Sequence, residues 1–169
     1  MFEARQLLSD DHHEVGEVLK QLLTALDNKD VAATYSRLDL LWARLAVHIR
    51  AEHLHLFPAV ASKHSEAESV IEKLREDHNF FMRELAQAIG ILREPPQASN
   101  TEARLTAILD TVREIEKRLT IHNKLEEDQI YRWAKTILTE PEQLDLATHI
   151  QHELENRPLR FSEQAWVNQ

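Results

Sequence analysis

The feature that most constrains this chain is a His-x-x-x-Glu pair that occurs twice, each time at the end of an apolar stripe. The first pair is His48 with Glu52, and the second is His122 with Glu126. Residues four apart lie on the same face of an α-helix, so each imidazole lies one turn from its carboxylate. Apolar residues recur at steps of three and four before each histidine, which turns both pairs toward the core of a bundle. Buried polar groups need partners, and together an imidazole and a carboxylate are a metal-ligand pair.

An Asp-His dipeptide precedes each pair, so the chain contains an internal repeat. Asp11-His12 lies in the first predicted helix and Asp77-His78 in the third. Both histidines continue apolar stripes with the same spacing, and both are therefore expected to face inward. A four-helix bundle brings four such faces together. The residues expected to converge at one level are His12, His48, Glu52, His78, His122 and Glu126.

The low glycine and proline content favours long helices with few connections. The chain has two Gly and five Pro in 169 residues, too few for the frequent turns of a strand-rich fold. We predict an all-α, up-and-down four-helix bundle with a short extra C-terminal helix, in one domain over residues 1–157 followed by a tail at 158–169. Five helices are predicted. The first ends near Leu26, the second spans Val31–Phe57, and the third begins after Ser65 and continues to Arg93. The fourth extends from Asn100 to Leu138, and the fifth from Thr139 to Asn156. Asp30 is expected to cap the second helix, and capping boxes are expected at Ser65 and Ser99.

Charge and composition exclude several classes of function. The formal net charge is −9, and no basic run is interleaved with aromatic residues, which argues against nucleic acid and anionic membranes as partners. No cysteine is present, so disulfides, thiolate metal sites and cysteine nucleophiles are excluded. No signal peptide or transmembrane run is found, which makes the cytoplasm the expected location. Ten histidines point instead to imidazole chemistry.

The six convergent residues suit a pair of metal ions. Four imidazoles and two carboxylates favour Fe, Mn or Zn, because thiolates that would select copper(I) or a cluster are absent. If each Glu bridges two metals, the protein supplies about four bonds per ion, and a bridging oxide or hydroxide supplies a fifth. One position on each ion then stays open, in an apolar pocket, for dioxygen, nitric oxide or peroxide.

At this point the chain resembles the hemerythrin-like, or HHE cation-binding, family from about Leu8 to Leu138. The resemblance rests on the ordered motifs in four helices and on the Leu56-Phe57-Pro58 ending of the second. It implies a non-haem di-iron centre, with two Fe ions joined by carboxylate and oxo or hydroxo bridges. Carried over by position, the ligands are His12, His48, Glu52, His78, His122 and Glu126. The set is similar to that of bacterial relatives, some of which sense oxygen or redox state.

Several functions remain open. The first is a binding protein for dioxygen, nitric oxide or a related small ligand, acting in sensing, storage or stress response, with a protein partner or a homo-oligomer reading the result. The second is a di-iron oxidoreductase acting on peroxide or nitric oxide, for which His55 and Tyr131 are the candidate proton donors. The others are an iron–sulphur cluster repair factor and an interaction module with a structural zinc site. Whether the chain is an enzyme is left undecided.

A few further residues carry hypotheses. His55 lies three residues after Glu52 on the same inward line, so we expect either an extra ligand or a group in the ligand pocket. For Asp11 and Asp77, a surface charge and support of a ligand histidine are both open readings. Solvated faces are expected for the remaining histidines, which are His13, His53, His64, His149 and His152.

Overall fold

The computed structural model describes residues 3–95 and 100–156, and within these ranges the chain is helical without a strand. The helices in chain order are α1 (Ala4–Asp27), α2 (Val31–Ala51), the π-helix η1 (Glu52–Leu56), α3 (Phe57–Ala61), α4 (Ala67–Arg93), α5 (Thr101–Leu125), the π-helix η2 (Glu126–Ile130), α6 (Tyr131–Ile137) and α7 (Glu140–Glu155). None of the described helices is long and apolar enough to cross a bilayer. The predicted tail at 158–169 lies outside the described residues.

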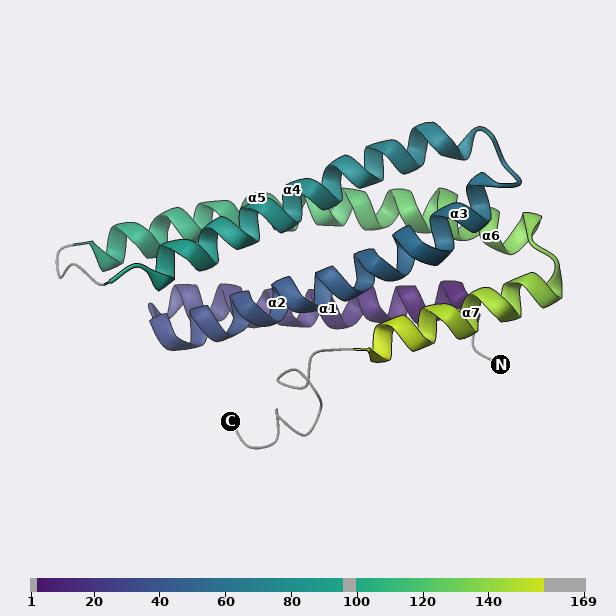
Figure 1. The fold of residues 1–169 in the computed structure, drawn as a ribbon. Helices are drawn as coiled ribbons and strands as arrows, with labels where there is room; N and C mark the ends of the chain where they lie inside the picture. The colour runs from purple at the N-terminus through teal and green to yellow at the C-terminus, as the bar shows by residue number, and fades with distance from the viewer. Residues whose placement is uncertain (1–2, 96–99, 157–169) are drawn as a thin grey trace.

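Helices α1, α2, α4 and α5 form the predicted up-and-down bundle (Figure 1). Each of them contacts two of the others, in the cyclic order α1, α2, α4, α5. The turn between α1 and α2 contains Lys29 at φ 54°. Asp30 then caps α2 as predicted, because its Oδ1 accepts a hydrogen bond from the Ala33 amide at 3.0 Å. The short fifth helix is α7, and it packs against α1 and α2.

The capping box expected at Ser65 is not formed. The residue before α4 is Glu66, and no side chain caps this helix. The reason lies in the preceding turn, where the carbonyls of His64 and Ser65 already accept the amides of Ala67 and Glu68. Ser99 lies outside the described residues. A capping box does occur at Thr139, whose hydroxyl and backbone amide pair with Glu142 at the start of α7.

Two π-helices interrupt helices that were expected to be unbroken. Each begins at the glutamate of a His-x-x-x-Glu pair, and its wide turn closes when the amide five residues later bonds back to that glutamate. In η1 the donor is Phe57, and in η2 it is Tyr131. Pro58 follows only η1, so the missing amide of a proline is not their common cause. The wide turn places the fifth residue above the glutamate, on the same side of the helix.

The apolar core is divided into two clusters with polar residues between them. One cluster fills the bundle near the α1–α2 turn, and the other lies between the opposite ends of the helices and α7. The buried polar and charged residues of the described ranges are Asp11, Thr34, His48, Glu52, Asp77, His78, His122 and Glu126. The two clusters exclude water from both ends of this polar layer.

Stability of the first cluster is testable at Leu38, which is fully buried. We expect Leu38→Ala to lower the free energy of unfolding by about 2–5 kcal/mol, because the lost side chain leaves a cavity in a packed core. The matched control is Leu54→Ala, since Leu54 is 56% exposed. Urea unfolding followed by circular dichroism measures both. Equal losses in the two variants would contradict this description of the core.

Candidate metal centre

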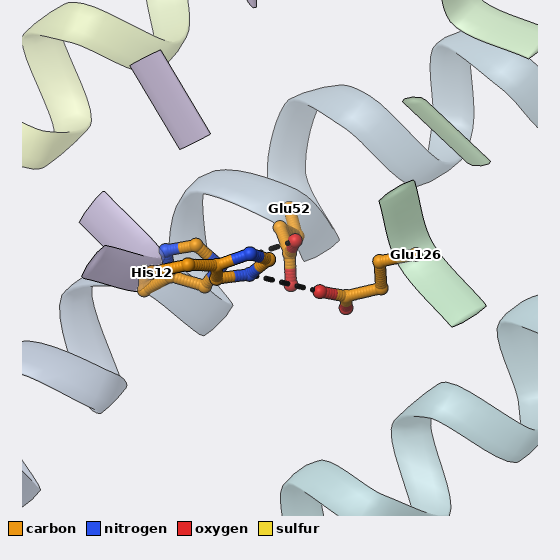
Figure 2. Close-up of side chains that lie close together, drawn as sticks. His12, Glu52 and Glu126 are labelled. Atoms are coloured by element: carbon orange, nitrogen blue, oxygen red, sulfur yellow. Dashed lines mark ion pairs between the residues drawn. The ribbon is translucent and has the colours of Figure 1, made fainter. Parts of the chain in front are cut away.

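The structure brings the six sequence-predicted residues together in the polar layer. They come from four different parts of the bundle: His12 on α1, His48 and Glu52 at the α2–η1 junction, His78 on α4, and His122 and Glu126 at the α5–η2 junction. Donor atoms of His12, His48, Glu52 and Glu126 lie within 4.8 Å of one another, as do those of His78, His122 and Glu126. Figure 2 shows the carboxylates of Glu52 and Glu126 directed toward the same region as the His12 ring.

Each glutamate offers one oxygen to each of two histidine pairs. Glu52 places Oε1 3.2 Å from Nε2 of His48 and Oε2 3.3 Å from Nε2 of His78. Glu126 places Oε2 3.1 Å from Nε2 of His12 and Oε1 2.9 Å from Nε2 of His122. Two positions result: at the first, four donor atoms lie within 4.8 Å of one another, and at the second three do, with Glu52 Oε2 as a fourth donor 3.3 Å from His78. We call them position A, beside His12 and His48, and position B, beside His78 and His122.

The donor atoms fit a pair of cations. Two ligands at right angles around one ion, each about 2.1 Å from it, lie about 3.0 Å apart, close to the separations above. Buried atoms without a hydrogen-bond partner include Nε2 of His48, Oε2 of Glu52 and Oε1 of Glu126. Nε2 of His78 and Nε2 of His122 are only 3.0 Å apart. Unpaired polar atoms in a dry interior are costly, and one cation at each position would satisfy them.

The aspartates of the two Asp-His motifs hold histidines of the neighbouring helices. Asp11 Oδ2 is 2.8 Å from Nδ1 of His48, and Asp77 Oδ2 is 3.1 Å from Nδ1 of His122. Each aspartate also accepts from an arginine, Arg44 for Asp11 at 3.1 Å and Arg118 for Asp77 at 2.7 Å. An Nδ1–H bound to a carboxylate leaves Nε2 free to bind a metal. Of the two readings left open for these aspartates, the structure supports the second.

The other two histidines are held by residues that the sequence analysis did not assign to the site. Nδ1 of His12 is 3.3 Å from Glu127, and Nδ1 of His78 is 2.8 Å from Nε2 of His53. His53 was expected on a solvated face, which is wrong, because its ring is partly buried against His78. The internal repeat of the sequence indicates that these two residues are related. His53 follows Glu52 as Glu127 follows Glu126, so the two occupy equivalent places with different chemistry.

The contact of His53 with His78 leads to a prediction. His53→Ala removes the partner of Nδ1 and frees the His78 ring to turn, so the affinity of position B for metal is expected to fall by about 10–100-fold. Calorimetric titration with a divalent metal measures this affinity. His13→Ala, an exposed histidine without a ligand contact, is the control. Unchanged affinity in His53→Ala would show that His78 is oriented without this contact.

His55 does not join the six residues. Its Nε2 is 3.5 Å from Glu153 on α7, and its ring lies 5.1 Å from that of His149. The expectation of an extra ligand or pocket group assumed α-helical spacing after Glu52. Because η1 has a wider turn, His55 is rotated off the inward line and onto the side covered by α7.

Tyr131 does reach the site. Its hydroxyl donates to Glu52 Oε1 at 2.9 Å and lies 3.1 Å from Nε2 of His12. The equivalent residue in the first half is Phe57, whose ring is stacked on that of His78 with centroids 6.0 Å apart. The two π-turns thus place an aromatic residue over each position, and only the one at position A carries an oxygen.

Comparison with known families agrees with this geometry. The model of the hemerythrin HHE cation binding domain matches residues 4–134, more than half of the chain. The chain belongs to the hemerythrin HHE family. No curated protein and no solved structure matches it significantly. The HHE domain therefore covers the four bundle helices, and its buried His and Glu residues include two groups that could hold a metal ion.

Electrostatics in the HHE domain couple the histidines to the carboxylates. Burial alone lowers the pKa of His48, but Glu52 and the bond to Asp11 outweigh it and raise that pKa well above its usual value. Burial tends to raise the pKa of Glu126, yet the His122 charge and the bond from His12 hold it well below its usual value. Burial, then Glu52 and Glu126, raise the pKa of Tyr131. Without a metal, the site is a network of paired charges.

A small cavity adjoins four histidines of the HHE domain, which are His12, His48, His78 and His122. Its other walls are mostly apolar, from Val15, Leu45, Ile49, Phe81 and Leu119, with Asn123 beside them. Apolar walls admit a small uncharged molecule and disfavour ions.

Proposed function

We propose that this HHE domain holds two non-haem iron ions and binds a small diatomic ligand, dioxygen or nitric oxide, for sensing, storage or stress response. One observation carries the proposal: Glu52 and Glu126 each present one oxygen to position A and one to position B. A carboxylate that faces two donor sets in this way is suited to bridging two ions. When bound, an iron pair supplies changes of oxidation state and open coordination positions for the ligand.

The chain's own residues have three tasks in this proposal. Asp11 and Asp77 fix the tautomer of His48 and His122, so that Nε2 is the nitrogen free to bind. The glutamates balance the cationic charge inside the bundle. Val15, Leu45, Phe81 and Leu119 keep water from the small cavity beside the histidines.

The binding proposal and an oxidoreductase differ in their need for a proton donor. Of the two proton donors considered from the sequence, His55 contacts α7 instead of the site, whereas the Tyr131 hydroxyl donates to Glu52 within it. An enzyme that consumes peroxide or nitric oxide needs a group that delivers protons to the bound ligand. Sustained turnover of either substrate by the reduced iron protein would favour the enzyme. A stable, reversible ligand spectrum without turnover is the result we expect.

Metal content tests the proposal directly. Protein purified without added metal is analysed for elements, and its visible spectrum is recorded after reduction and again after exposure to air. We expect about two irons per chain and an air-dependent absorption band, both strongly reduced in His122→Ala because position B loses a nitrogen ligand. His13→Ala is the control. Zinc as the sole bound metal would support a structural site and overturn the redox function.

A further inference from the structure

The hydroxyl of Tyr131 lies among the donor atoms of position A. It is 2.9 Å from Glu52 Oε1, 3.1 Å from His12 Nε2 and 3.4 Å from Glu126 Oε2. These are three of the four donors assigned to that position. We infer that the phenol oxygen of Tyr131 is a fifth protein ligand of the ion at position A. The inference rests on the proposed two-iron function.

The distances are those expected between ligands of one ion. Neighbouring ligands at right angles, about 2.1 Å from the ion, are about 3.0 Å apart, and the Tyr131 oxygen keeps roughly this separation from the three donors. The tyrosine is also held rigidly, because its side chain is 1% exposed and its ring is stacked on His12 with centroids 5.6 Å apart. A residue packed in this way is already placed for coordination.

The π-helix η2 is what brings Tyr131 to this place. Its wide turn puts the fifth residue after Glu126 over the carboxylate, whereas an α-helical turn would rotate that residue away. In the other half, η1 does the same for Phe57, which has no donor atom and stacks on His78. Position A thus has five protein ligands and position B has four. The two ions of the pair are chemically different.

The difference between positions A and B determines where the diatomic ligand binds. A phenol oxygen gives up its proton on coordination, and the proton is released to solvent. The resulting anion occupies a coordination position of the ion at A and favours the ferric state there. Position B has no such group, since Phe57 takes the equivalent place. The diatomic ligand therefore binds at position B, beside His78 and His122.

Spectroscopy of the iron-loaded protein tests the assignment. Wild type, Tyr131→Phe and Tyr35→Phe are loaded with ferrous iron and oxidised in air, and iron is then counted by elemental analysis. Tyr35 is the control, because the chain has only two tyrosines and this one pairs with Arg93 away from the site. We expect about two irons in all three proteins. A phenolate-to-iron(III) absorption band, with phenolate ring vibrations in resonance Raman spectra, is expected in wild type and Tyr35→Phe and absent in Tyr131→Phe.

The possible results separate the two proposals. About two irons in wild type without a phenolate band would overturn the role of Tyr131 and leave the two-iron site standing. No bound iron in wild type would overturn the proposed function and the tyrosine ligand with it. If Tyr131→Phe does not fold, as judged by circular dichroism, the assignment still has a test. A phenolate band that persists in Tyr35→Phe can come only from Tyr131.

Discussion

Replacement of Glu126 by alanine is expected to abolish metal binding at both positions. The two oxygens of this side chain face different histidines, His12 at 3.1 Å and His122 at 2.9 Å, and it also lies 3.5 Å from His78. Changes to residues that merely orient a ligand cost about 10–100-fold in metal affinity. Loss of a carboxylate shared by both ions is expected to cost more than about a hundredfold at each.

The measurement is iron or zinc per chain after loading and gel filtration, with a calorimetric titration for the affinities. Glu116→Ala is the matched control, because Glu116 is an exposed glutamate on the same helix, α5. Circular dichroism checks that both variants remain helical. If Glu126→Ala still binds one ion with wild-type affinity, Glu126 does not bridge the two positions.

The metal-free protein is expected to be most stable near pH 6.5 and to lose stability on both sides. Burial lowers the pKa of His122, but Glu126 and the bond to Asp77 outweigh it and raise this pKa from 6.5 to about 9. The folded chain therefore holds a proton that the unfolded chain releases between these values, so the free energy of unfolding falls as pH rises from 6.5 to 9. A gap of about 2.5 pH units, at about 1.4 kcal/mol each, amounts to a loss on the order of 3 kcal/mol.

Below pH 6.5, the free energy of unfolding changes with pH in the opposite direction. Burial, His78 and Arg75 lower the pKa of His53 to about 4, so the unfolded chain binds a proton that the folded chain does not. Stability is then lost as pH falls from 6.5 toward 4. His53 is only partly buried, so solvent screening makes this effect smaller than that of His122.

Urea unfolding across this pH range, in the presence of a chelator, measures the metal-free profile. The metal-loaded protein is the control, because a histidine bound to metal is neutral and releases its proton on binding. In the metal-loaded protein, the fall in the free energy of unfolding between pH 6.5 and 9 should disappear. This free energy should also rise by about 4 kcal/mol per ion when free metal is at a thousandfold excess over the dissociation constant. A metal-free profile that is flat between pH 6.5 and 9 would contradict the charge network.

The sequence by itself determined the helices and the set of inward-facing polar residues. Apolar steps of three and four follow from the period of the α-helix, so the inward direction of His12, His48, His78 and His122 could be read without a structure. The same holds for the cap at Asp30, which depends on residues three apart. The role of the six residues as metal ligands remains a prediction to be tested by metal analysis.

Only the tertiary structure decided what surrounds these residues. The π-turns after Glu52 and Glu126 change the residue spacing, so His55 was placed wrongly, and Tyr131, already a candidate from the sequence, could be assigned to position A only from the structure. The contacts of Asp11 with His48 and of His53 with His78 join different helices. Such contacts depend on how far one helix is shifted along another, and this shift is set by side-chain packing across the bundle. Periodicity within a single helix gives the face of each residue but contains no information on that shift.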